Sequence, residues 1–346
     1  MLSQLLVLDM PHAVGLIEFL TNYTFRNMLV GTTIIGGASG ALGCFLYLRK
    51  QSLTSDVIGH SAIAGVMIAF IFATVVLSIE GRSMFVLTIG SIIAATAAVL
   101  MSNWISRDSR ISLDAAMAIC LSLFYGGGIV LMRIITHSTL QGRGGIDKYM
   151  FGNASTLTRA DIYTIVFFGS LSIIVMMLFW KEFKVFSFDP VLSETLGFSY
   201  RTLNPLLMGT ATVAIVIGVK AVGLILMIAF AIMPAASARQ WTKRLSTMVL
   251  LASILGAGSA AFGSFLAVNI GKVPTGPVVV LVLFTVFCFS LIAAPERSVL
   301  RRALIRRAKT RELEALARER DNVPVRNHDV DKSVAGALVT VESVGR

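Results

Sequence analysis

Two side chains that could bind a metal ion lie four residues apart in an apolar stretch of the chain. Asp56 and His60 occur in the segment SLTSDVIGHSAIAG. Residues four apart share one face of a helix, so the carboxylate and the imidazole would project together. This ligand pair suits a divalent transition ion such as zinc, manganese or iron. Two ligands do not complete a coordination shell, so the remaining ligands must come from elsewhere.

The residues around this pair favour a helix packed inside a membrane. Charged groups in a bilayer cost about 2.5–3.5 kcal/mol each on insertion scales, so they usually mark function. Small residues let helices approach closely and let polar groups face a cavity; here they are Gly59, Ser61, Ala62, Ala64 and Gly65. One alternative stays open at this point: Asp56 could cap the helix N-terminus while His60 bonds a neighbour.

Other candidate residues and motifs give weaker signals. Asp114 is well placed as a helix N-cap, and His137 lies near the outer end of the fourth apolar run, where it could touch an incoming ion. The three cysteines lie inside apolar runs without a CxxC pair, as small buried residues do. The chain has no GxxxxGK[ST], HExxH or GxSxG motif, so we expect neither a P-loop ATPase nor a protease or other enzyme.

The composition indicates a polytopic membrane protein. The chain is 55% hydrophobic and only 14% charged, against about 25% charged residues in soluble domains. Several apolar runs approach the roughly 18–20 residues of a membrane-spanning helix. The expected spans are about 28–48, 58–78, 84–104, 114–135, 161–180, 246–270 and 276–294.

The stretch 206–234 decides the number of spans. Basic residues concentrate in cytoplasmic loops, and they flank this stretch on both sides, in 181–205 and 235–245. Both flanks can be cytoplasmic only if the chain between them crosses twice, which predicts two short segments, 206–219 and 221–234. The all-α fold then has about nine transmembrane segments, or eight if 206–234 is one helix. The N-terminus lies outside and the C-terminus in the cytoplasm.

The charge distribution also defines the ends of the chain. Residues 1–25 are interrupted by polar positions, which favours an interfacial segment on the outer side, and 26–296 form the transmembrane domain. For residues 297–346 we expect a basic cytoplasmic tail, with a short amphipathic helix followed by a disordered end. The net charge of +11 follows from these loops and this tail; without zinc-finger spacing or a basic globular domain, we expect no nucleic-acid partner.

With these residues in view, the sequence resembles the zinc/manganese/iron permeases of ABC transporters, the ABC-3 family. The likeness runs from about Phe25 to Pro295, and Ala64 replaces a proline that the family often has. Six segments carry it in the family's order: GALGCFLYLRKQSLTSDVIGHSAIAG, LDAAMAICLSLFYGGGIVL, IDKYMFGNASTLTRADI, FKVFSFDPVLSETLGFSYRTLN, KAVGLILMIAFAIMPAASARQWTKRLSTM and VPTGPVVVLV.

The resemblance implies a fold like that of type II ABC importers and a set of partners. Two permeases, identical or different, pair in the bacterial inner membrane, each docks an ATP-binding subunit inside, and a solute-binding protein delivers the metal outside. Asp56 and His60 match the family's metal site. The divalent ion is the transported substrate, with no permanently bound cofactor. The family's ATPase-coupling region matches 234–248; the segment residues named for that role are Pro234, Ala235, Ala236, Arg239 and Trp241.

The resemblance further implies alternating access, in which ATP hydrolysis in the partner subunits opens the metal site first outward and then inward. The alternative function is an ATP-independent secondary metal-ion transporter. Such a carrier would need further intramembrane charges for a coupling ion, and the chain shows few. Dependence on a nucleotide-binding partner separates these two hypotheses.

Overall fold

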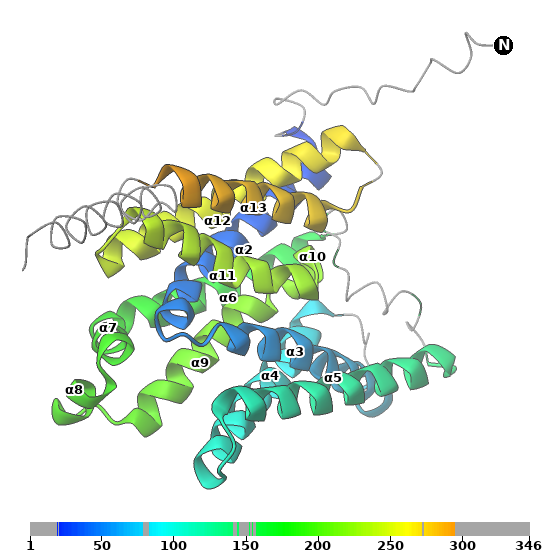
Figure 1. Ribbon diagram of the computed structural model, residues 1–346. Coiled ribbons are helices and arrows are strands. Elements are labelled where there is room, and N and C mark those ends of the chain that lie inside the picture. The colour runs from blue at the N-terminus through cyan, green and yellow to red at the C-terminus, as the bar shows by residue number, and fades with distance from the viewer. Residues whose placement is uncertain are drawn as a thin grey trace, which may run out of the picture. The chain divides into compact units, whose positions relative to one another are not determined.

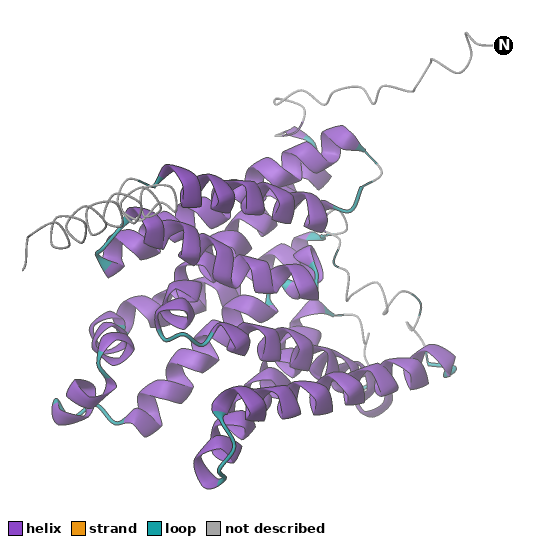
Figure 2. Cartoon of the chain, in the orientation of Figure 1, coloured by secondary structure: helices purple, strands orange, loops and turns teal. Residues whose placement is uncertain are grey.

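The computed structural model describes residues 19, 21–78, 83–140, 144, 152, 154, 157–271 and 273–294, and gives the backbone alone for 220, 221 and 224–226. Within these ranges the chain is helical and contains no strand (Figures 1 and 2). The helices are α2 (Tyr23–Leu48), α3 (Ser52–Ile71), the π-helical turn η1 (Phe72–Val76), α4 (Met84–Asp108), α5 (Leu113–His137), α6 (Arg159–Leu178), α7 (Trp180–Phe188), α8 (Pro190–Thr195), α9 (Tyr200–Val216), α10 (Val219–Val222), α11 (Leu224–Trp241), α12 (Leu245–Ile270) and α13 (Thr275–Ala293).

Seven helices of the described chain are long and apolar enough to cross a membrane. They are α2, α3 with η1, α4, α5, α6, α12 and α13, and each coincides with one of the seven long spans expected from the sequence. The largest difference at a helix start is in α3, which begins at Ser52 rather than near residue 58. Asp56 therefore lies within the helix instead of in front of it.

The stretch 206–234 is broken, as the two-segment prediction requires. α9 ends at Val216, the short α10 follows, and Gly223 precedes α11 with a φ of 93°. Residues with a side chain rarely adopt such a φ, so glycine suits this break. α9 and α11 extend outward to Tyr200 and Trp241, beyond the expected limits. The total of nine crossings stays a prediction.

α2 lies at the centre of the helix bundle. It packs along α12 and also contacts α11, α6 and α9. A Cβ atom added to Gly36 would lie 2.5 Å from the carbonyl oxygen of Gly256 in α12, so only glycine permits this approach of the two backbones. α2 thereby lies between α12 and α11 on one side and α6 and α9 on the other (Figure 1).

α3 is packed in the same close manner against α4 and α5. A Cβ on Gly65 would lie 2.3 Å from the carbonyl oxygen of Gly90 in α4, and one on Gly128 in α5 would lie 2.8 Å from the nitrogen of Ala64. The small residues that follow His60 therefore do bring neighbouring helices close to α3.

Two short helices, α7 and α8, connect α6 to α9, and the sequence reading did not separate them from an ordinary loop. Asp189 is the N-cap of α8 and accepts hydrogen bonds from the backbone N–H groups of Val191 and Leu192 at 3.1 and 3.0 Å. Pro190 occupies the first helical position, where its missing N–H has no helical partner to lose. The pair Asp-Pro was therefore a readable signal of a helix start.

The two chain ends stay outside this description. The helices from α2 to α13 all belong to one compact unit, Met1–Glu296. The expected interfacial segment 1–25 is described only from Phe19 onward with one gap, and the expected basic tail 297–346 lies outside the described residues. The division into an outer segment, a transmembrane domain and a cytoplasmic tail stays a prediction.

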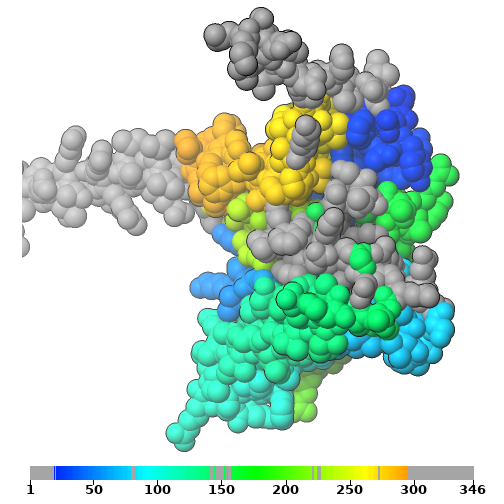
Figure 3. All heavy atoms as spheres, turned by 90° about the vertical axis from the view of Figure 1, so that its right-hand side faces the viewer, coloured from blue at the N-terminus to red at the C-terminus, as the bar shows by residue number. Residues whose placement is uncertain are grey.

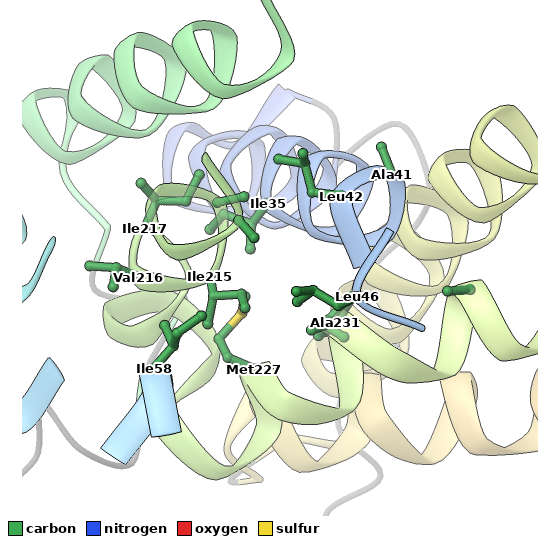
Figure 4. Packing of buried hydrophobic residues seen from close by; sticks show 14 of the residues in the cluster. Ile35, Ala41, Leu42, Leu46, Ile58, Ile215, Val216, Ile217, Met227 and Ala231 are labelled. Atoms are coloured by element: carbon green, nitrogen blue, oxygen red, sulfur yellow. The ribbon is translucent and has the colours of Figure 1, made fainter. Parts of the chain in front are cut away.

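The hydrophobic core joins α3, which carries Asp56 and His60, to the rest of the bundle. In Figure 4, Ile58 of α3, Ile215 of α9 and Met227 of α11 converge beside Ile35 and Leu46 of α2. Ile58 and Met227 are fully buried, and Ile215 is almost so. The buried side of α3 is thus held by α2, α9 and α11.

Candidate metal site and coupling segment

Asp56 and His60 lie one helical turn apart on α3 and contact each other. The His60 Nε2 atom is 3.1 Å from Asp56 Oδ1. The N-cap of α3 is Gln51, which makes no side-chain capping bond, and Asp56 is a full turn further into the helix. The alternative in which Asp56 caps the helix is therefore wrong, and the two groups form an intrahelical pair.

The surroundings of His60 leave one ring nitrogen unpartnered. The side chains of His60 and Asp56 are 21% and 32% exposed, so both are reachable from one side. The imidazole and the ring of Tyr125 in α5 are nearly perpendicular, at 83°, with their centroids 4.9 Å apart. The Nδ1 atom is buried and has no hydrogen-bond partner among the described residues. Tyr125 lies in the LSLFYGGG segment, and sequence reasoning did not identify it as part of the site.

The spacing of the two groups fits neighbouring ligands of one ion. Metal–nitrogen and metal–oxygen bonds of about 2.0–2.2 Å place two ligand atoms of one ion roughly 3.0–3.5 Å apart, from right-angled to tetrahedral geometry. The observed 3.1 Å between Nε2 and Oδ1 matches this separation. Within the described ranges, no group of three or more His, Cys, Asp or Glu side chains gathers at one place. The pair therefore offers a partial coordination shell.

The weaker candidates Asp114 and His137 lie at the two ends of α5. Ser112, rather than Asp114, is the N-cap of α5 and accepts a bond from the N–H of Ala115; Asp114 lies in the first turn. His137 is exposed at the end of α5, and its Nδ1 is 2.9 Å from the carbonyl oxygen of Arg133. Cys44 and Cys120 are buried and Cys288 is half-buried, all three as free thiols.

The segment proposed for ATPase coupling is the last part of α11. Pro234 does not end the helix, which continues to Trp241. Pro234, Ala235 and Ala236 are buried, whereas Trp241 is 42% exposed. Arg239 is partly exposed, and its guanidinium lies 3.5 Å from the carbonyl oxygen of Lys243 in the turn before α12. The expected separate small helix is thus the exposed end of a long one.

α11 connects this exposed end to the metal-site helix. It packs against α3 as well as α2, α12 and α13. Met227 near its start and Ile58 of α3 share the buried core shown in Figure 4. α11 therefore contacts the helix that carries Asp56 and His60 and also forms the exposed segment that ends at Trp241.

A second junction, missed by the sequence reading, fixes the start of α3. Arg49, in the turn between α2 and α3, donates a hydrogen bond of 2.8 Å to Asn204 of α9 and lies 4.4 Å from the ring centre of Phe186 in α7. Burial lowers the pKa of Arg49, while Tyr200 acts in the opposite direction. This arginine ties α7 and α9 to the turn that leads into the metal-site helix.

With this geometry in place, the chain can be compared with known proteins. Residues 21–294 match the ABC 3 transport family. The chain is 37% identical over 294 residues to the manganese transport system membrane protein MntC of Bacillus subtilis, covering 84% of this chain and 66% of that relative, just under two thirds. It is 33% identical to the zinc transport system membrane protein TroC of Treponema pallidum, covering 83% of this chain and 94% of TroC.

A solved structure agrees with this relationship. The structure of PsaBC from Streptococcus pneumoniae in complex with Fab superposes with a TM-score of 0.72 at 28% sequence identity, over 83% of this chain and 99% of that one. The family match spans the metal-site helix, the broken stretch and the coupling segment together. The chain is therefore a member of the ABC 3 transport family, a multi-pass membrane permease subunit whose ATPase is a separate subunit.

Proposed function

We propose that this permease belongs to an importer that carries a divalent transition-metal ion, manganese, zinc or iron, into the cytoplasm. The observation that carries the proposal is the Asp56–His60 pair, spaced 3.1 Å apart on a helix long and apolar enough to cross a membrane. Imidazole and carboxylate together suit such ions. The names of the relatives, which refer to manganese and zinc transport, support the same substrate class.

The partial ligand set suits transport rather than storage. A transported ion must bind well enough to enter the site and weakly enough to leave it. Water or a second permease, identical or different, supplies the remaining ligands. The half-exposed positions of Asp56 and His60 support this arrangement, because the pair is accessible from one side of α3.

Alternating access is the mechanism that we propose. A solute-binding protein releases the ion into an outward-open cavity, and ATP hydrolysis in the partner subunits rearranges the permeases so that the site opens inward. The chain sits in the bacterial plasma membrane with its N-terminus outside and its C-terminus in the cytoplasm. The concentration of basic residues in the turns after α2, α4 and α11 supports this orientation.

The exposed end of α11, from Arg239 to Trp241, is the proposed contact for the ATP-binding subunit. A half-exposed tryptophan is a good anchor, since aromatic residues often dominate binding energy at interfaces. The buried Pro234, Ala235 and Ala236 hold this end against the bundle. Movement imposed on Trp241 would then reach α3 through the contact between α11 and α3.

Co-purification tests the coupling proposal. Trp241→Ala should reduce the ATP-binding subunit recovered with the tagged permease by roughly tenfold, the size of effect expected for a tryptophan at an interface. Trp104→Ala is the matched control, because Trp104 is also exposed but lies at the end of α4. Full recovery of the ATP-binding subunit with Trp241→Ala, or equal loss with both variants, would contradict the role of α11.

A further inference from the structure

A large cavity lies between α2, the end of α6, the start of α7 and α12, away from the metal-site pair. Its volume is about 750 Å³, which is within the range of small-molecule sites. Most of its wall is apolar and includes Ala41, Ile173, Met177, Val249 and Leu250. None of its lining residues belongs to α3, α4 or α5.

One end of this cavity carries two opposite charges. Lys181 and Glu182, the first residues of α7 after Trp180, both line it. The Glu182 Oε2 atom is buried and has no hydrogen-bond partner among the described residues. The same carboxylate lines the cavity, so a cationic group of a ligand lying there would balance its charge. The hydroxyl groups of Ser246 and Ser253 on α12 add polar atoms to the lining.

The cavity is placed where a membrane lipid could reach it. The residues around it on the outer surface, such as Met177, Leu178, Leu250 and Ile254, are strongly exposed apolar side chains, as expected for a lipid-facing surface. Trp180 and Lys181 stand at the end of the membrane-spanning α6, the position that interfacial aromatic and basic residues favour. The charged end of the cavity thus suits a phospholipid headgroup, and its apolar walls suit the acyl chains.

A second permease is a poorer occupant than lipid. α12 lies on the opposite side of the bundle from α4 and α5, toward the top in Figures 1 and 3, whereas α5 lies toward the bottom. The Asp56–His60 pair lies on α3 against Tyr125 of α5, and neither helix lines the cavity. A second permease that shares the metal site therefore does not have to cover the cavity.

We propose that this cavity binds one phospholipid with a primary amine headgroup, of the phosphatidylethanolamine class. Its phosphate pairs with Lys181, its ammonium group pairs with the carboxylate of Glu182, and its acyl chains lie along the apolar wall formed by α6 and α12. An anionic headgroup satisfies Lys181 but offers Glu182 no cation, so charge complementarity selects the zwitterionic amine. The proposed site binds a membrane lipid, and its occupancy does not depend on which metal ion the chain transports.

Native mass spectrometry of the purified full-length chain tests the proposal with added phosphatidylethanolamine or phosphatidylglycerol. The wild-type chain should retain one phosphatidylethanolamine in preference to phosphatidylglycerol, and Glu182→Gln should weaken that retention by roughly tenfold, since a charge-assisted bond is lost. Glu194→Gln on α8 is the matched control, because Glu194 is exposed and does not line the cavity. Equal retention of the two lipids by the wild type, or no effect of Glu182→Gln, overturns the proposal.

Fluorescence quenching locates the lipid. The chain has three tryptophans, so Trp104→Phe together with Trp241→Phe leaves Trp180, which lines the cavity, as the reporter. Phosphatidylethanolamine with brominated acyl chains should quench Trp180 more strongly than brominated phosphatidylglycerol, and Glu182→Gln should abolish the difference. Equal quenching by the two lipids in the parent variant contradicts the assigned site, even if mass spectrometry detects bound lipid.

Discussion

At the scale of single residues, the contact between Asp56 and His60 could be predicted from their spacing in the sequence. Their contacts with other helices depend on tertiary packing. Asp56 and His60 are four apart, and the helix brings their side chains to 3.1 Å. Nothing in local sequence indicates that Tyr125, on a different helix, meets the His60 ring. Helical periodicity relates neighbours within one helix, whereas the contact between α3 and α5 depends on how the bundle packs.

The contact with Tyr125 orients His60 in the proposed site. Aromatic pairs contribute about 0.5–1.5 kcal/mol beyond area burial, so Tyr125→Ala should weaken metal binding roughly two- to tenfold. Titration of the purified chain with manganese or zinc, followed by calorimetry, measures this effect.

Tyr125→Phe is the matched variant for this titration. The ring geometry carries the contact with His60, so the phenylalanine should retain near wild-type affinity. Wild-type affinity in Tyr125→Ala would show that the ring contact does not orient the ligand. A loss in Tyr125→Phe as large as in Tyr125→Ala would instead assign the effect to the hydroxyl group.

At the scale of elements, glycine positions decide how closely α3 can approach its neighbours. A Cβ on Gly65 would lie 2.3 Å from a backbone oxygen of α4, whereas a Cβ on Gly126 of α5 meets nothing within 4 Å. Gly65→Val should therefore destabilise the chain by about 1–3 kcal/mol or more through overpacking, and Gly126→Val should leave its stability nearly unchanged. Thermal unfolding in detergent compares the two; equal midpoints would contradict the close α3–α4 packing.

The Arg49 junction gives a second prediction about elements. A hydrogen bond to a charged group contributes about 1.5–3 kcal/mol, so Asn204→Ala should lower the unfolding midpoint measurably. Asn103→Ala is the control, because the Asn103 side chain bonds the carbonyl of Val99 in its own helix.

A double-mutant cycle of Arg49→Ala and Asn204→Ala should show coupling of about 1 kcal/mol or more. Additive effects of the two substitutions would mean that the bond of 2.8 Å does not hold α9 to the turn before α3.

Long apolar elements were predictable from runs of apolar residues, whereas the short helices gave no such run and only the start of α8 carried a local signal, Asp189-Pro190. The seven long spans follow from runs of apolar residues, which the bilayer requires. α7 and α8 are nine and six residues long, too short for an apolar run or a clear periodicity to identify them. The charge rule predicted that 206–234 is broken, but it could not predict that α9 and α11 extend beyond that stretch, since the extensions are partly polar.

At the scale of the whole molecule, the proposed ATPase contact and the proposed metal site are connected through α11. The exposed Trp241 lies at one end of α11, and the buried Met227 packs in the same core as Ile58 of α3. The sequence identified both ends of this connection by resemblance to a family. It could not identify the connection itself, because the packing of α11 on α3 joins segments far apart in the chain.

Metal uptake by cells that contain this chain, its ATP-binding subunit and its solute-binding protein tests the central claim most directly. Asp56→Asn and His60→Gln, at membrane abundance equal to wild type, should each lower accumulation of radiolabelled manganese or zinc by more than roughly tenfold, since each removes a ligand. Asp114→Asn and His137→Gln, which change the same residue types at the two ends of α5, where both side chains are exposed, should retain wild-type uptake. Uptake that survives both site substitutions, or that persists without ATP hydrolysis, would contradict the account.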